Sequence, residues 1–154
     1  MLVLVLGGCR PQTPPEVKAS DFSCAFEAKL GDTVFGGTLK RYTAGTLELI
    51  FQKPETVEGL VACWDGETVN LQFHGLNFDL PSGSFPEQAL GEAMVGALDA
   101  VLRGDVEGTM QDGTLTVQGE LNGAAYTLLC HDNGLPKRLV VPDYGLDITF
   151  AQTE

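Results

Sequence analysis

Apolar and polar residues alternate along most of the chain. Between residues 22 and 30 every second residue is apolar, a period of two that is typical of a half-buried strand. The same reasoning predicts strands at 33–42, 46–53, 60–64, 67–73, 76–80, 106–110, 114–121, 124–131, 137–141 and 146–150. Turn pairs such as Asp65-Gly66 and Asn122-Gly123 supply the positive φ angles of tight hairpins. We therefore expect an antiparallel meander.

One segment instead has the period of a helix. Ser84 and Glu87 form a capping box with Pro86 in the first turn, and apolar residues then recur at spacings of three and four up to Leu102. This predicts a helix at about 85–103. The fold class expected is mainly β with one central helix (α+β): a curled antiparallel sheet, or half-barrel, packed on that helix.

The first nine residues form an apolar run that ends in a cysteine. Residues 2–8 are too few for the roughly 20 that span a bilayer. The sequence Leu6-Gly7-Gly8-Cys9 resembles the bacterial lipobox, which implies acylation of Cys9 and cleavage before it. The alternative is an ordinary first strand with a buried cysteine. The prolines within 10–15 argue against that strand, because proline donates no N–H to a ladder.

These features divide the chain into three parts. Residues 1–8 are expected to be a partial signal peptide, 9–21 a lipidated cysteine with a Pro-rich tether, and 22–154 a single β domain. The lipobox implies an extracytoplasmic protein that is anchored to the bacterial cell membrane through an N-terminal lipid.

Charge narrows the range of partners. The 154 residues carry 21 acidic and 9 basic side chains, a net charge of −12. This excludes nucleic acid, whose phosphates require Lys and Arg, and it disfavours direct adsorption to anionic lipids. Three cysteines remain after Cys9, namely Cys24, Cys63 and Cys130, and no Cys-x-x-Cys motif occurs. Buried free thiols are favoured, although one disulfide remains open.

No motif for catalysis is found. His74 and His131 have no neighbour at a metal-ligand spacing, and Gly83-Ser84-Phe85 fits a helix cap better than a nucleophile elbow. We expect no catalytic residue, no metal, no cofactor and no enzymatic activity.

The order of elements is similar to that of the LolA/LolB-like lipoprotein-carrier superfamily, which includes LppX-type lipoproteins and periplasmic sensor domains. The local likeness runs from Tyr42 to Phe73, with the strand at 47–51, Pro54, and the hairpin at Asp65-Gly66. The likeness extends loosely over 22–150. It implies a curled sheet around helices, with a hydrophobic cavity for acyl chains.

The expected function is therefore that of a membrane-anchored lipoprotein that binds or carries a lipid or another hydrophobic ligand. The alternative is a tethered envelope interaction or sensor domain, with a packed core and an envelope protein as partner. Apolar residues on the inward strand faces and the helix are the candidate pocket lining: Phe26, Leu49, Phe51, Leu71, Phe73, Met94, Leu98, Leu115, Val117 and Leu128.

Overall fold

The computed structural model describes residues 21–43, 46–65, 68–81, 88–103 and 107–152. The predicted signal, Cys9 and the tether lie outside the described residues, as do the helix cap at 84–87 and Gly66 of the 65–66 turn.

The described residues form a mainly β fold with a single helix, which confirms that part of the predicted class. The helix α1 runs from Gln88 to Arg103, and single 3₁₀ turns lie at Glu55–Val57 and Pro142–Tyr144. The strands are β1 Phe22–Leu30, β2 Thr33–Thr43, β3 Thr46–Lys53, β4 Val61–Trp64, β5 Thr68–Phe73, β6 Leu76–Pro81, β7 Gly108–Gln111, β8 Thr114–Leu121, β9 Ala124–His131, β10 Pro136–Val141 and β11 Leu146–Gln152.

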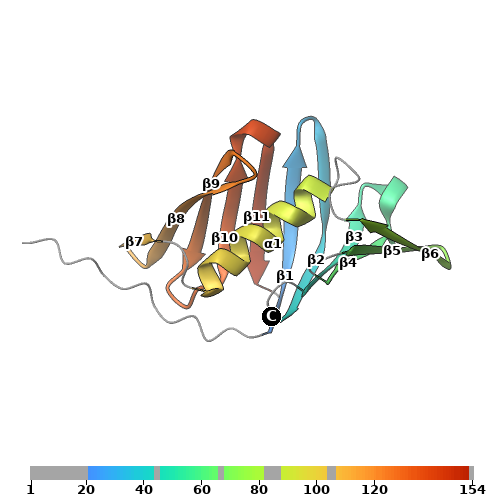
Figure 1. Ribbon diagram of the computed structural model, residues 1–154, viewed down its shortest axis with the longest axis horizontal. Helices are drawn as coiled ribbons and strands as arrows, with labels where there is room; N and C mark the ends of the chain where they lie inside the picture. The colour runs from blue at the N-terminus through green and yellow to red at the C-terminus, as the bar shows by residue number, and fades with distance from the viewer. Residues whose placement is uncertain (1–20, 44–45, 66–67, 82–87, 104–106, 153–154) are drawn as a thin grey trace, which may run out of the picture.

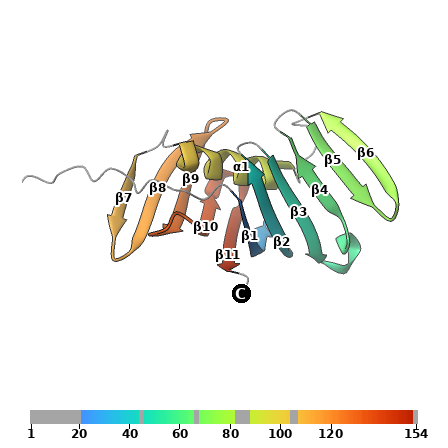
Figure 2. The same ribbon diagram turned by 90° about the horizontal axis from the view of Figure 1, so that it is seen from below.

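All eleven strands belong to one open antiparallel sheet, in the order β6-β5-β4-β3-β2-β1-β11-β10-β9-β8-β7. Neighbours along the chain pair as a meander, except that α1 separates β6 from β7. The sheet is continued instead by the first and last strands, which pair Phe26 with Phe150. The edges are therefore β6 and β7, and the sheet does not close into a barrel (Figure 2). The finer prediction of a half-barrel stays a prediction.

Tight turns join most of the paired strands as predicted. Asn122 and Gly123 have φ angles of 50° and 84°, and Asp112 and Gly113 have 48° and 72°. Two successive positive φ angles define a type I′ turn, whose twist matches that of the flanking strands. The turn chemistry therefore fixes the β8–β9 and β7–β8 pairs.

The core lies between α1 and one face of the sheet (Figure 1). On β1, Cys24, Phe26 and Ala28 point to this face and are buried, while Ser23 and Glu27 point to the opposite face and are exposed. We call these the helix face and the outer face. No helix within the described ranges is long and apolar enough to cross a membrane.

α1 lies across the middle of the sheet and stops before β5 and β6 (Figures 1 and 2). Near its start, Gly91 lies so close to the Trp64 indole that a Cβ atom there would overlap the ring. Further along, Gly96 lies against Leu121 at the end of β8. The helix therefore covers the helix face diagonally from β4 to β8 and leaves the β5–β6 hairpin beyond its first turn.

Candidate functional site

The β5–β6 hairpin presents an apolar surface that α1 does not cover. The ladder pairs Leu71 with Phe78 and Phe73 with Leu76. Residues directly opposite in an antiparallel pair point to the same face. Leu71 is in turn paired with the buried Ala62 of the helix face. The helix face thus continues onto this hairpin, and we call its five large apolar residues the apolar shelf: Leu71, Phe73, Leu76, Phe78 and Leu80.

The shelf becomes more exposed toward the edge of the sheet. Leu71, Phe73 and Leu80 are partly buried, whereas Leu76 is 59% and Phe78 is 51% exposed. In the centre of the same face, Leu39 and Leu49 are fully buried. The pattern of apolar positions is the same in both regions, so the difference comes from the cover and not from the strands.

The outer face of the hairpin is polar. The Asn70 side-chain amide donates to the side-chain oxygens of Asn77 and, at 2.8 Å, of Asp79. Gln72 in turn donates to the Asn70 oxygen at 2.9 Å. These four side chains form an amide ladder across the two strands. The two faces of the hairpin therefore differ: its outer polar side chains bond to one another in the ladder, while the shelf has no equivalent partner among the described residues.

Trp64 lies beside the shelf. It pairs with Val69, which pairs with Leu80. Its side chain is buried because α1 packs on the indole at Gly91. The buried Nε1 atom has no hydrogen-bond acceptor among the described residues. An unpaired buried donor costs about 1–3 kcal/mol, so an acceptor that reached this N–H would gain energy.

Most of the predicted pocket lining lies in the centre of the core. Leu71 and Phe73 belong to the shelf; the other eight are buried, namely Phe26, Leu49, Phe51, Met94, Leu98, Leu115, Val117 and Leu128. Leu49, Met94 and Leu128 have no accessible surface. Side chains that line a space wide enough for water would keep some, so these three border no open cavity. A ligand could reach them only if α1 moved.

A buried ion pair holds α1 to the sheet. Arg41 of β2 donates from Nε to Asp99 Oδ1 at 3.1 Å, and its Nη2 donates to the same oxygen at 2.5 Å. Both side chains are 5% exposed. Burial makes a charge costly unless it is paired and hydrogen-bonded, which this contact achieves. The pair therefore fixes the helix in the position that covers the centre and leaves the shelf open.

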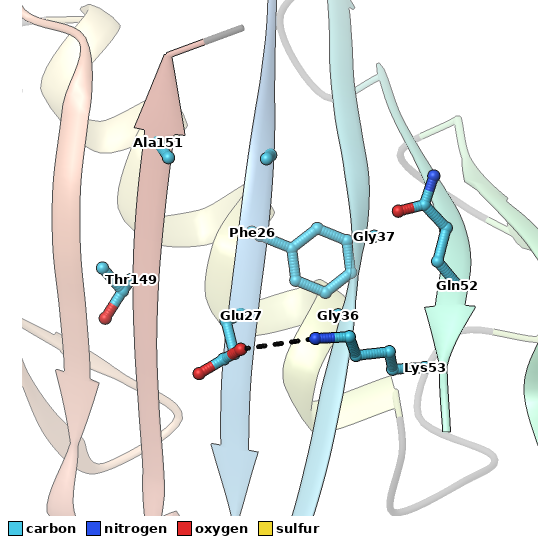
Figure 3. Close-up of a pocket in the computed structure, with 9 residues that line it drawn as sticks. Phe26, Glu27, Gly36, Gly37, Gln52, Lys53, Thr149 and Ala151 are labelled. Atoms are coloured by element: carbon cyan, nitrogen blue, oxygen red, sulfur yellow. Dashed lines mark ion pairs between the residues drawn. The ribbon is translucent and has the colours of Figure 1, made fainter. Parts of the chain in front are cut away.

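A hollow of about 440 Å³ lies on the outer face across β11, β1, β2 and β3 (Figure 3). Gly36 and Gly37 are part of its lining, and a bulge between β2 and β3 lies at these glycines. A Cβ atom at Gly37 would overlap the Ile50 carbonyl, so this position requires glycine. Glu27 and Lys53 form an exposed ion pair at 4.0 Å beside it. The hollow is open to solvent and is lined by both polar and apolar residues. Its polar side chains do not converge on one point.

The thiols are poor nucleophiles. Cys24, Cys63 and Cys130 are all free, so the disulfide left open by the sequence is not formed. Burial raises the pKa of both Cys24 and Cys130 to about 12. Burial and the neighbouring Glu48 carboxylate also raise the pKa of Cys63. Within the described residues, no group of three or more His, Cys, Asp and Glu side chains could hold a metal ion.

Comparison with known proteins gives a likeness in fold. No family model matches the chain, and no curated protein matches it. An uncharacterized conserved protein from Thermus thermophilus superposes with a TM-score of 0.56 and 12% identity, over 92% of this chain and 84% of that one. A LolA superfamily protein from Nitrosomonas europaea gives a TM-score of 0.42 and 9% identity, over 91% and 86%.

The first likeness shows a shared fold and nothing about ligand or activity. The TM-score of the second is below 0.5, so that likeness carries no argument.

The sequence identified two of the five shelf residues. Leu71 and Phe73 were among the candidates, whereas Leu76, Phe78 and Leu80 were not. Their alternation with Asn77 and Asp79 was visible in the sequence. They were missed because the expected pocket was placed under the helix, and strand alternation does not reveal where a helix ends.

Proposed function

We propose that the protein is a membrane-anchored extracytoplasmic lipoprotein that binds a hydrophobic ligand on the apolar shelf. The observation that carries the proposal is the exposure of Leu76 and Phe78 on an otherwise covered apolar face. Large apolar patches on a soluble surface mark binding sites for apolar partners. The shelf is two strands wide and, from Leu76 to Leu80, about 14 Å long at ~3.4 Å per residue. A single acyl chain fits such a strip.

The Trp64 N–H, which has no acceptor among the described residues, favours an acyl ligand that carries one, such as the carboxyl or ester group of a lipid. The net charge of −12 disfavours large anionic headgroups and leaves the apolar contact as the main source of affinity.

The single tryptophan of the chain gives a direct test of binding. We expect Trp64 emission of the full chain, with Cys9→Ser to prevent lipidation, to change on titration with a long-chain fatty acid. Phe78→Ser and Leu76→Ser should each weaken binding about tenfold, since each removes roughly 1.4 kcal/mol or more of apolar burial. Val34→Ser is the matched control, because Val34 is 42% exposed on β2, outside the shelf. Equal loss in the control, or no binding by the parent chain, would rule out the shelf as the ligand site.

The anchor has its own test. We expect the chain with Cys9 to fractionate with membranes and the Cys9→Ser variant to remain in the aqueous fraction. A Cys9→Ser variant that stays with the membranes would contradict lipid anchoring without bearing on the shelf.

A second candidate function is a tethered interaction or sensor domain. The zero exposure of Leu49, Met94 and Leu128 favours it, because the packed core leaves no space for a ligand beside these described side chains. This function predicts that native mass spectrometry finds the protein empty after incubation with fatty acids and lipids. Retention of an acyl ligand would exclude it in favour of the first.

A further inference from the structure

Among the described residues, β6 pairs with β5 on one side and with no strand on the other. β6 is the last strand in the order of the described sheet, and six residues form it. In an antiparallel ladder, alternate residues turn their N–H and C=O groups to one neighbour and then to the other. Half of the β6 backbone groups therefore face away from β5. Such an edge is a template for a further strand.

The residue order of β6 is palindromic in its chemistry. Leu76-Asn77-Phe78-Asp79-Leu80 has the order apolar, polar, apolar, polar, apolar in both directions. The two polar residues on either side of Phe78 are an amide, Asn77, and a carboxylate, Asp79. A twofold antiparallel pair centred on Phe78 sets Leu76 opposite Leu80 of the second copy, and Asn77 opposite its Asp79. Every apolar residue then meets an apolar residue on the shelf side, and every carboxylate meets an amide.

Other registers fit less well. A shift by one residue places apolar side chains opposite polar ones on both faces. A pair centred on Asp79 sets two carboxylates directly opposite, which is destabilising. A pair centred on Asn77 places Asp79 beside the turn glycine Gly75 and shortens the overlap. The complementarity of charge and polarity therefore selects one register.

The side-chain hydrogen bonds agree with this register. Asn77 accepts from Asn70 through its oxygen, which leaves its NH₂ group to donate across the edge. Asp79 is the charged residue of β6, and its carboxylate accepts from Asn70 at 2.8 Å with capacity for more donors. Pairing would extend the amide ladder across both copies on the outer face.

We propose that two copies of this chain associate through β6, as a twofold antiparallel pair centred on Phe78. The two sheets become one, and the two apolar shelves form a single apolar surface with the Phe78 side chains at its middle. The pairing does not depend on a ligand, so it stands or falls separately from the proposed function.

The opposite edge lacks these features. β7 has only four residues, Gly108–Gln111, and the exposed acids Glu107 and Asp112 flank it. Short strands and charged flanks are how natural sheets prevent pairing at an edge. In a chain with a net charge of −12, acids at both ends of a strand would oppose a second copy. β6 is therefore the edge that we assign to association.

The dimer should be weak in solution. A ladder of this length buries less than the ~1,200 Å² of a standard stable interface. Anchoring of both copies in one membrane would raise their effective concentration and favour the pair.

Sedimentation equilibrium of the full chain with Cys9→Ser, from roughly 10 µM to 1 mM, tests the association. We expect the weight-average mass to rise with concentration toward that of a dimer. Phe78→Lys places two cations together at the twofold axis and should raise the Kd at least tenfold. Thr109→Lys, an exposed position on β7, should leave the Kd unchanged. A parent chain that stays monomeric, or equal effects of the two variants, would overturn the proposal.

Cross-linking tests the register even if Phe78→Lys perturbs folding. In a background with Cys9→Ser and Cys63→Ser, Asn77→Cys and Asp79→Cys proteins should form a disulfide efficiently when mixed, because these positions lie directly opposite. Each protein alone should cross-link several-fold less, since position 77 of one copy is only diagonal to 77 of the other. Cross-linking of the mixture no better than of either protein alone would refute the register and with it the proposed pairing.

Discussion

The centre of the sheet and the β5–β6 hairpin have the same alternating pattern and opposite surroundings. Leu49 on β3 has no accessible surface, whereas Phe78 on β6 is 51% exposed, although both lie on the helix face. The centre is covered by α1, which the buried Arg41–Asp99 pair holds in place. The hairpin has an amide ladder on its outer face and no cover on the shelf among the described residues. Alternation along a strand therefore specifies a face, while a distant element decides whether that face becomes core or binding surface.

The largest effect is expected from breaking the ion pair that holds the cover. Asp99→Ala removes the carboxylate that pairs with the buried Arg41 cation, which should lower the free energy of unfolding by about 3–5 kcal/mol. Urea denaturation followed by circular dichroism measures this loss. The double variant Arg41→Met with Asp99→Leu should recover most of it, because no buried charge remains. A loss below about 1 kcal/mol for Asp99→Ala would mean that the pair does not hold the helix on the sheet.

Truncation of one residue in each region tests the comparison itself. Leu49→Ala should cost about 2–5 kcal/mol, since it opens a cavity in packed core. Phe78→Ala should cost about 1 kcal/mol or less, because half of the ring is already in water and substitutions at exposed sites have small effects. The same urea experiment measures both. Equal costs would mean that the shelf is covered in the folded protein, and the distinction between the two regions would fail.

The pairs joined by tight turns could be predicted from the sequence for a local reason. At Asn122-Gly123 two adjacent residues determine the positive φ angles, and hence the β8–β9 pair. The β1–β11 pair could not be predicted in this way. It joins the two ends of the described domain, and the sequence of neither strand indicates its partner except through a matching apolar face. The edges at β6 and β7 follow from that non-local pair.

The candidate site was only partly predictable for a related reason. The sequence gives the length of α1 but not its direction across the sheet. That direction depends on contacts between distant residues: Gly91 with Trp64, and Arg41 with Asp99. If the direction of the helix is not known, the covered Leu49 and the exposed Phe78 are equally good candidates for the lining of a pocket. The shelf is defined by where the helix stops, which is a tertiary property.

The approach of α1 to the sheet gives a smaller, sharper test. A Cβ atom at Gly91 would overlap the rigid Trp64 ring, whereas one at Gly96 would meet only the terminal Cδ2 methyl of Leu121. Gly91→Ala should therefore lose about 1–2 kcal/mol, since overpacking outweighs the gain in helix propensity. Gly96→Ala should be neutral or stabilising by up to ~1 kcal/mol. Thermal unfolding of both variants measures the difference. If the two variants change the stability equally, the close contact between Gly91 and Trp64 does not determine how near the helix lies to β4.

The smallest effect is expected at the exposed ion pair between Arg138 of β10 and Asp147 of β11. The hydrogen bonds that Arg138 donates, at 2.9 and 2.6 Å, lower the pKa of the Asp147 carboxyl below its ordinary value. Arg138→Ala should raise that pKa toward the ordinary range, which a carboxyl-carbon NMR titration measures.

The sign of the pH dependence follows from that lowered pKa. A carboxyl that ionises more readily when folded adds stability above its unfolded pKa, and this contribution disappears as the pH falls through the folded pKa. The parent chain should thus exceed Arg138→Ala slightly in stability at neutral pH, and the two should converge in acid. The difference should be far smaller than for Asp99→Ala, because Arg138 and Asp147 are 51% and 40% exposed and water screens their attraction. A loss comparable to that of Asp99→Ala would show that burial under α1 is not what separates the two ion pairs.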